Sequence, residues 1–389
     1  MFGFGRLGSY AYFAHVQREL EARFAAAGIE LVAHVIEDLP TASIPRRAAR
    51  LAEVVTESSG DRDPIHLLGH STGGLDARLV ASPSTRSISP DKLRWLPRLR
   101  TVTTMNTPHL GSPLASFFAT SKGQHALAAL SVLTMTGLAI GARPLAAASM
   151  LLGVLRGTDR VLPLRIKLVD RSVTSVVGIV DDARSPEVKT FLAAIGDDQG
   201  SMMQLSPEAM DLVASSFADR PEVTYQSTVS MAPKPQPRRW LGTIGHPWRT
   251  LSMTLFYALH RLTANVSERY PCAAMRGDSP WTDDVTEAFL TAALGSTASV
   301  NDNDGIVPVR SQIWSNVVWA GFGDHLDVLG HYLDRRSGEP ELPHRDWLTS
   351  GSGFSDREFA TLIDAIAAGM LGVRAHVAGP STPQRFAHS

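Results

Sequence analysis

One short segment restricts the possible folds of this chain more than any other. Residues 64–78 read Pro-Ile-His-Leu-Leu-Gly-His-Ser-Thr-Gly-Gly-Leu-Asp-Ala-Arg. Ile65–Leu68 is a short apolar run of the kind that forms a buried strand, and apolar residues return with helical spacing after it. Gly69 and Gly73 lie two residues before and after Ser71, which predicts a turn too tight for a Cβ at either glycine. A strand that turns this sharply into a helix is typical of an α/β protein.

The remaining sequence alternates between strand-like and helix-like segments. In chain order, we predict a helix at Tyr10–Ala27, a strand at Ile29–Val35, a helix at Ile44–Ser58, a strand at Ile65–Leu68, a helix at Gly73–Val80, strands at Leu99–Met105 and Glu222–Met231, a helix at Trp248–Val266, a strand at Asn316–Ala320 and a helix at Asp356–Leu371. Such alternation favours a mostly parallel, doubly wound sheet with right-handed crossovers. Ligands of such sheets bind at the carboxyl ends of the strands, where Ser71 is expected.

Changes in composition along the sequence divide the chain into four predicted regions. Residues 1–113 are predicted to form the first part of the α/β core. Residues 114–215 are apolar and helical in character, which predicts an inserted helical cap or lid. Residues 216–372 return to the core, with a further helical cap segment near 240–280. Residues 373–389 are predicted to be a disordered tail.

Composition excludes several classes of function. The 389 residues contain 37 Lys and Arg against 38 Asp and Glu, so no nucleic-acid partner is expected. The single cysteine, Cys272, excludes an intramolecular disulfide framework and a Cys-based zinc site. Met1–Arg6 lacks the pattern of a signal peptide, so the chain as it stands is predicted to be cytoplasmic. Secretion stays open if the true start lies upstream.

The apolar stretch of residues 126–155 has two interpretations. Ala126–Ala142 approaches the length of a membrane helix but contains Ser131, Thr134 and Thr136 and is followed by Arg143. We therefore favour an apolar cap over a functional site, and an apolar face exposed when such a cap opens would favour transient contact with a lipid interface.

Ser71 has the sequence context of a nucleophile. Gly69-His70-Ser71-Thr72-Gly73 matches the G-x-S-x-G pattern between a strand and a helix. A serine hydroxyl needs a histidine base, and that histidine needs a carboxylate to orient it. On this kind of sheet the chain order should be Ser, then Asp or Glu, then His. Asp304 and His325 are the preferred acid and base.

Two alternatives to this acid and base stay open. Asp302 lies in the same polar turn as Asp304, but Gly305 directly after Asp304 would let the loop turn there. His331 lies six residues after His325, in a segment expected to be helical.

Four motifs in this order resemble those of the bacterial true lipases of the α/β-hydrolase superfamily. They are Gly69–Gly74, the Thr-Pro-His-Leu-Gly-Ser segment at 107–112, Asn303–Val307 and Asp324–Asp327. The resemblance covers most of the chain outside the cap. It implies an α/β-hydrolase fold with Ser71 as nucleophile, Asp304 as acid, His325 as base and segment 107–112 as structural support. It also implies a lipase or esterase acting on a small-molecule or lipid ester. Acyl transfer, polyester cleavage or a catalytically impaired binding protein are the alternatives.

The resemblance also assigns an oxyanion hole, a pair of backbone N–H groups that stabilise negative charge on the substrate oxygen. One donor would be the N–H of Thr72. The other aligns with Met1, because the N-terminal strand and the His-Gly dipeptide that precede this position in the family are missing here. We therefore expect the true start to lie upstream.

No cofactor is expected to be required, although the resemblance makes a structural calcium possible. Its carboxylates would be Asp327 with Asp283 or Asp284. The alternative is that these residues cap helices.

Overall fold

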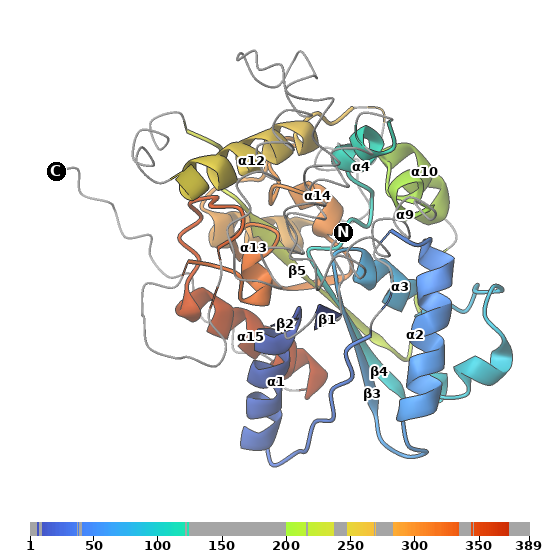
Figure 1. Cartoon of the computed structure of the whole chain (residues 1–389). Coiled ribbons are helices and arrows are strands. Elements are labelled where there is room, and N and C mark those ends of the chain that lie inside the picture. The colour runs from blue at the N-terminus through green and yellow to red at the C-terminus, as the bar shows by residue number, and fades with distance from the viewer. Residues whose placement is uncertain are drawn as a thin grey trace, which may run out of the picture.

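The structure is a computed structural model, shown in Figure 1. It describes residues 6–7, 10–36, 38, 41–120, 123, 200–214, 217–236, 247–267, 269, 283–333, 344 and 346–372.

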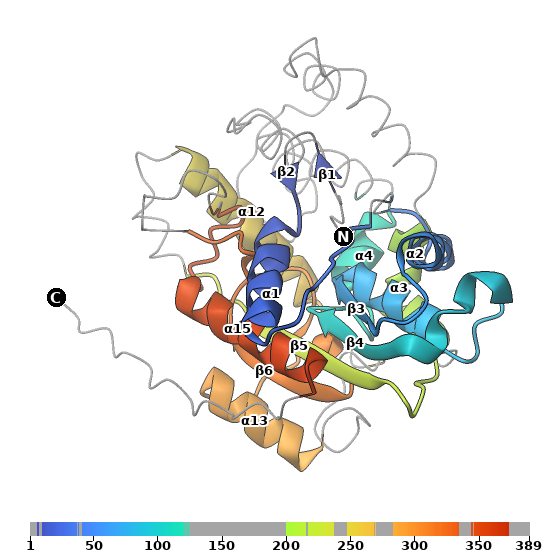
Figure 2. The ribbon, with the colours of Figure 1, turned by 90° about the horizontal axis from the view of Figure 1, so that it is seen from below.

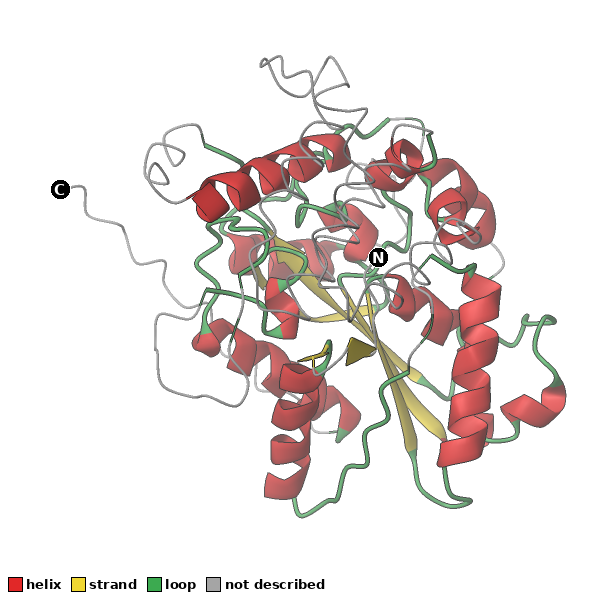
Figure 3. Ribbon diagram, in the orientation of Figure 1, coloured by secondary structure: helices red, strands yellow, loops and turns green. Residues whose placement is uncertain are grey.

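The centre of the molecule is a four-stranded parallel sheet (Figures 1 and 3). Its strands are β3 (Ile65–His70), β4 (Leu99–Met105), β5 (Thr224–Met231) and β6 (Asn316–Phe322), in the spatial order β3-β4-β5-β6. Each neighbouring pair is parallel. The carboxyl ends of all four strands therefore lie along one edge, where segments distant in sequence meet.

Helices cover both faces of the sheet (Figure 2). They are α1 (Ala14–Ala26), α2 (Ile44–Ser58), α3 (Thr72–Ala81), α13 (Asp284–Leu294) and α15 (Asp356–Met370). On β5, Gln226 faces α15 and donates to the carbonyl of Ile366. Its neighbour Tyr225 packs in the core cluster that contains α2 and α3. The alternating side chains of one strand thus contact opposite helical layers, as a doubly wound sheet requires.

Shorter elements surround the carboxyl edge. They are β1 (Arg6–Leu7), β2 (Tyr10–Ala11), α4 (Pro113–Phe118), α9 (Gly200–Gln204), α10 (Pro207–Ala214), α12 (Pro247–Thr263), α14 (Val309–Gln312) and the 3₁₀ turns Pro90–Leu93, Leu96–Arg98 and Asp327–Leu329. β1 and β2 pair with each other and not with the central sheet. Within the described chain, β3 is therefore an edge strand of that sheet.

Most predicted elements form, several with the predicted bounds. Ile44–Ser58 is helical and Leu99–Met105 is a strand, as the sequence predicts. The predicted helix at Tyr10–Ala27 is too long, because Tyr10–Ala11 is a strand. The strand predicted at Ile29–Val35 is wrong. Leu31 packs against the core and Val32 is 68% exposed, but no ladder partner lies beside the segment among the described residues.

Several expectations lie outside the described residues. They concern Met1, most of the predicted cap including Ala126–Ala142, Cys272 and the tail 373–389. None of the helices in the described part of the chain has both the length and the apolar character needed to cross a membrane.

Candidate active site

Ser71 lies in the turn between β3 and α3, in a backbone conformation that L-residues rarely adopt. Its φ is 55° and its ψ is −128°. Two backbone hydrogen bonds hold the turn, from the N–H of Ser71 to the carbonyl of Met105 (2.8 Å) and from the N–H of Gly74 to the carbonyl of Ser71 (3.2 Å). Such a conformation costs on the order of 1–3 kcal/mol and persists only where surrounding contacts enforce it. The strain is therefore concentrated at the serine itself.

The glycines around Ser71 have different roles. A Cβ on Gly69 would lie 2.3 Å from the backbone carbonyl carbon of Gly73, so no side chain fits there. At Gly73 itself a Cβ would meet nothing within 4 Å, so the prediction that both flanking glycines are required is wrong for Gly73. The second restricted position is Gly74, where a Cβ would lie 2.0 Å from Oγ1 of Thr107. The turn is tight because Gly69 packs on the backbone of the helix start.

Thr72 is the first residue of α3 and is buried. A residue in the first turn of a helix has no intrahelical acceptor for its N–H group. The positive end of the helix dipole adds to the attraction for negative charge at this point. The Thr72 N–H thus has the properties of an anion donor beside Ser71. Met1, the other predicted donor, lies outside the described residues.

Asp304 lies in a loop that folds back between Asn303 and Pro308 through an isolated antiparallel bridge. Its Oδ1 accepts the N–H groups of Ile306 (2.9 Å) and Val307 (2.7 Å). Gly305 has a φ of +95°, which fits the predicted turn directly after Asp304. The loop backbone therefore binds Oδ1 of Asp304 and leaves Oδ2 available to other side chains.

That second oxygen binds His325. Nδ1 of His325 lies 2.7 Å from Oδ2 of Asp304, and the backbone N–H of His325 donates to the carbonyl of Asp304 (2.9 Å). Because the carboxylate accepts, Nδ1 carries the proton and Nε2 of the neutral ring has the lone pair. Nε2 is buried and has no hydrogen-bond partner among the described residues. The imidazole is thus in the tautomer that a general base requires.

The two alternative residues are engaged elsewhere. Asp302 accepts the N–H of Ser299 (2.8 Å) and forms an ion pair with Lys234 (3.1 Å). His331 follows the short turn Asp327–Leu329 and does not lie in a helix. Its ring contacts the rings of Tyr12 and His15.

Sequence reasoning missed Asn106 as part of the site. It directly follows β4, has a φ of 48°, and donates through Nδ2 to Oδ2 of Asp304 (2.9 Å) and to the Ser230 hydroxyl. Asn106 thus ties the acid to the ends of β4 and β5. An asparagine at a strand end was the available signal, because asparagine tolerates the left-handed conformation.

The segment predicted to support the site also contacts the acid loop. The Ser112 hydroxyl donates to the carbonyl of Ile306 (2.6 Å), and the Ser311 hydroxyl donates to the carbonyl of Gly111 (2.6 Å). His109 lies in the interior, with Arg78 (3.0 Å) and Thr104 (3.1 Å) as partners. The segment therefore fixes the acid loop from the side of β4.

His70, the residue before Ser71, reaches the base. Its ring centroid lies 4.5 Å from that of His325, and its Nε2 lies 2.9 Å from the His325 carbonyl oxygen. The structure thus brings the turn of Ser71 and the Asp304–His325 pair to the same edge of the sheet. Ser71, Asp304 and His325 are at most 3% exposed, so the site is closed to solvent in this conformation.

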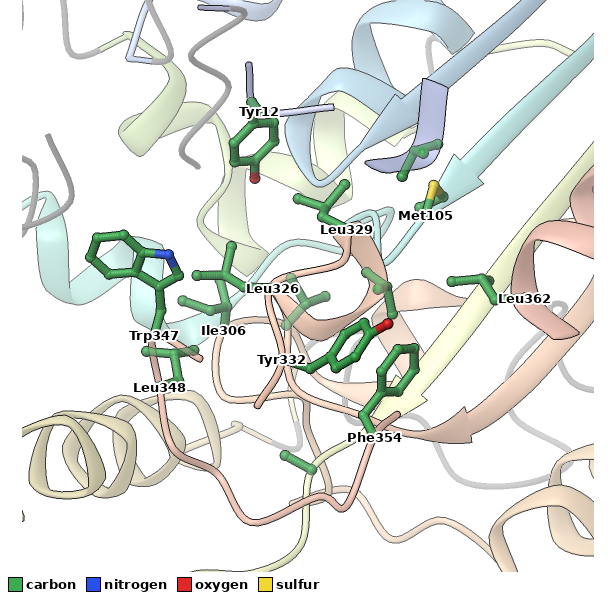
Figure 4. Packing of buried hydrophobic residues seen from close by; sticks show 14 of the residues in the cluster. Tyr12, Met105, Ile306, Leu326, Leu329, Tyr332, Trp347, Leu348, Phe354 and Leu362 are labelled. Atoms are coloured by element: carbon green, nitrogen blue, oxygen red, sulfur yellow. The ribbon is translucent and has the colours of Figure 1, made fainter. Parts of the chain in front are cut away.

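The loops that carry the acid and the base also contribute to a cluster of buried apolar side chains (Figure 4). Ile306 from the acid loop, Leu326 from the base loop and Phe256 from α12 belong to one buried cluster, together with Tyr12. The same helix supports the acid loop, because Thr263 donates to the carbonyl of Gly305 (3.1 Å). Buried hydrogen bonds are stronger in such an environment, and unpaired polar atoms are correspondingly costly.

The carboxylates considered for calcium have local partners. Asp283 caps α13 by accepting the N–H of Thr286 (2.7 Å). Asp327 is buried and accepts the N–H of Asp324 (2.8 Å) and the Ser352 hydroxyl (2.7 Å). Burial and the neighbouring carboxylates raise the pKa of Asp327, and burial raises the pKa of Asp324 to about 7. Within the described ranges, no group of three or more His, Cys, Asp or Glu side chains could hold a metal ion. Calcium binding stays a prediction.

Comparison with known proteins gives only distant likenesses. No protein-family model and no curated protein matches the chain. Among solved structures, a metagenomic carboxyl esterase has a TM-score of 0.44 and 15% identity over 93% of this chain and 70% of its own. EstA from Clostridium botulinum has a TM-score of 0.42 and 18% identity over 92% and 86%. Staphylococcus hyicus lipase has a TM-score of 0.44 and 15% identity over 95% and 92%. The chemistry of the site therefore rests on its own geometry.

Proposed function

We propose that the chain is a serine carboxylic-ester hydrolase of the α/β-hydrolase type, with Ser71, Asp304 and His325 as its catalytic triad. One observation carries the proposal: Oδ2 of Asp304 binds Nδ1 of His325 and leaves Nε2 without a hydrogen-bond partner among the described residues, on the same sheet edge as the strained serine turn. The chain order Ser, Asp, His is the order of this fold class. The backbone conformation of Ser71 supports the nucleophile assignment, since strain of this kind collects at functional positions.

In the proposed mechanism, Nε2 of His325 takes the proton of the Ser71 hydroxyl as its oxygen attacks the ester carbonyl. The negative charge on the carbonyl oxygen is stabilised by the N–H of Thr72 and a second donor near the N-terminus. His325 then protonates the departing alcohol, which leaves an acyl group on Ser71. Water, activated by the same imidazole, releases the acid and restores the enzyme.

The proposed substrates are esters with apolar acyl chains, either small molecules or lipids. The buried apolar cluster that contains Ile306 and Leu326 supports this choice, because apolar side chains beside the site favour an apolar acyl chain. Hydrolysis needs no metal in this scheme. Transient contact with a lipid interface is part of the proposal, and a nucleic-acid partner is not.

The test combines a label and a substrate series. A fluorophosphonate probe should label Ser71, as located by peptide mass spectrometry, and p-nitrophenyl esters of two to sixteen carbons should be hydrolysed. Ser71→Ala should lose the label and reduce kcat by about 10⁴-fold or more with an unchanged melting temperature. No labelling and no turnover by the folded wild-type protein would favour a binding protein. Turnover that increases when a second alcohol is added would instead favour an acyltransferase.

A further inference from the structure

The residue before the proposed nucleophile, His70, is placed to act on the base. It ends β3, is 5% exposed, and its ring packs against that of His325 at a centroid distance of 4.5 Å and an interplanar angle of 48°. The side chain extends from the end of β3 to the loop that carries the base.

The hydrogen bonds of His70 define its tautomer. Nε2 lies 2.9 Å from the His325 carbonyl oxygen, and a carbonyl oxygen only accepts, so Nε2 carries the proton. Nδ1 of the neutral ring must then accept, and its partner is the hydroxyl of Tyr12 at 3.1 Å. Burial lowers the pKa of His70 well below its ordinary value, which keeps the ring neutral. Both nitrogens of the ring are therefore satisfied, and Tyr12 selects the tautomer that faces His325.

Among the described residues, three hydrogen bonds hold His325, and one of them comes from the serine strand. The carboxylate of Asp304 binds Nδ1 of the His325 ring, and the backbone carbonyl of Asp304 accepts the backbone N–H of His325. Both of these contacts fix the base relative to the acid loop. The carbonyl of His325 is held by His70, whose backbone continues directly into Ser71. Of these three contacts, this last one joins the base directly to the strand that carries the nucleophile.

We propose that His70, oriented by Tyr12, is a positioning residue that sets the separation between the imidazole of His325 and the hydroxyl of Ser71. This inference rests on the proposed function, because it assigns a role within the same triad. A misplacement of about 1 Å between reacting groups can cost about 10²-fold in rate. Loss of the contact that sets this separation should therefore lower kcat more than it weakens substrate binding.

Three substitutions at His70 separate positioning from simple packing. His70→Gln places an amide N–H near the position of Nε2 and keeps the donor to the His325 carbonyl. His70→Asn places its amide near Nδ1 and loses that donor. His70→Leu keeps apolar volume and loses both polar atoms. If only packing matters, Leu should serve as well as Gln.

We expect kcat for a p-nitrophenyl ester to fall about 10- to 100-fold in His70→Leu and His70→Asn, with KM changed less than about twofold. His70→Gln should stay within about threefold of the wild type, and Tyr12→Phe should fall between. His66→Leu is the matched control, because His66 lies on the same strand and contacts Thr101 instead of the site. It should keep wild-type kcat.

A second measurement reads the tautomer directly. In the folded protein, the ¹⁵N shifts of His70 should report a neutral Nε2–H tautomer at pH 6.5, and Tyr12→Phe should weaken this preference. The inference is overturned if His70→Leu keeps wild-type kcat, if Gln fails to rescue, or if His70 carries its proton on Nδ1. Absence of ester turnover and of Ser71 labelling in the wild type would instead refute the proposed function. The tautomer measurement would still be valid in that case.

Discussion

The serine turn and the acid–base loops form the two halves of the candidate site, and they are held in different ways. The turn at residues 69–74 is shaped by contacts within six residues and the adjacent strand end, above all the approach of Gly69 to the backbone of Gly73. The loops at 301–308 and 323–331 are held by partners far away in sequence, such as Asn106 on Asp304 and His70 on His325. Local steric fit controls the first half, and long-range hydrogen bonds control the second.

This contrast explains why the two halves should respond differently to mutation. A turn held by steric exclusion has no room to adjust, so one added carbon displaces backbone. A loop held by several hydrogen bonds loses one bond at a time, at a typical cost of about 1–3 kcal/mol where a buried partner stays unsatisfied.

The largest expected effect comes from adding a methyl group to the turn. Gly69→Ala should destabilise the protein by about 3 kcal/mol and reduce kcat by 100-fold or more, because the new Cβ would lie 2.3 Å from the backbone of Gly73. Gly73→Ala is the matched control and should be neutral or stabilising by up to about 1 kcal/mol, since Gly73 is helical and its Cβ meets nothing within 4 Å. Urea unfolding and ester kinetics measure both quantities. Equal effects at the two positions would contradict a turn controlled by sterics.

An intermediate effect is expected where Asn106 binds the acid. Asn106→Gly removes the donor to Oδ2 of Asp304 and still allows the φ of 48°. We expect kcat to fall about 10-fold, together with a loss of about 1–3 kcal/mol in the free energy of unfolding.

The control for Asn106 is Ser315→Gly. Ser315 also has a positive φ, 52°, but is exposed and outside the site. Wild-type kcat is expected for this variant. If Asn106→Gly also kept wild-type kcat, the acid loop would be fixed by its own backbone alone, like the serine turn.

The smallest effect on ester turnover is expected beside the base loop, where the prediction concerns stability at acid pH. His15 on α1 is buried, stacks on His344 and fills the space beside Gly330. Burial lowers the pKa of His15 to about 4, below its ordinary value of 6.5. The unfolded chain therefore binds more protons between these values, and the free energy of unfolding falls as the pH decreases from 6.5 to 4. The limit for one proton is about 1.4 kcal/mol per pH unit.

His15→Phe keeps a ring on His344 and removes the titrating group, so the free energy of unfolding should depend less on pH in this range. Urea unfolding at pH 4, 5 and 6 measures the slope, and a measurement at pH 7.5 separates any change in packing. Parallel curves for the wild type and the variant would show that acid sensitivity lies elsewhere in the molecule.

Sequence patterns are informative where a feature is built from neighbouring residues. The alternation of apolar segments predicted the parallel α/β arrangement, including the bounds of Ile44–Ser58 and Leu99–Met105. The strand predicted at Ile29–Val35 failed because an alternating pattern cannot show whether another strand lies beside it. The role assigned to Gly73 failed for a similar reason, since the space around a Cβ depends on the packing of the turn.

The sequence by itself determined the strand-turn-helix that presents Ser71, because steric exclusion between residues 69 and 74 acts within a few ångströms along the chain. It also placed Asp304 and His325 in polar loops after the later strands. Only the tertiary structure decided that Asp304, and not Asp302, binds His325, and that Asn106 and His70 hold this pair. Parallel strands carry these residues to one sheet edge from positions up to 255 residues apart. Hydrogen bonding between them depends on distances that no local pattern contains.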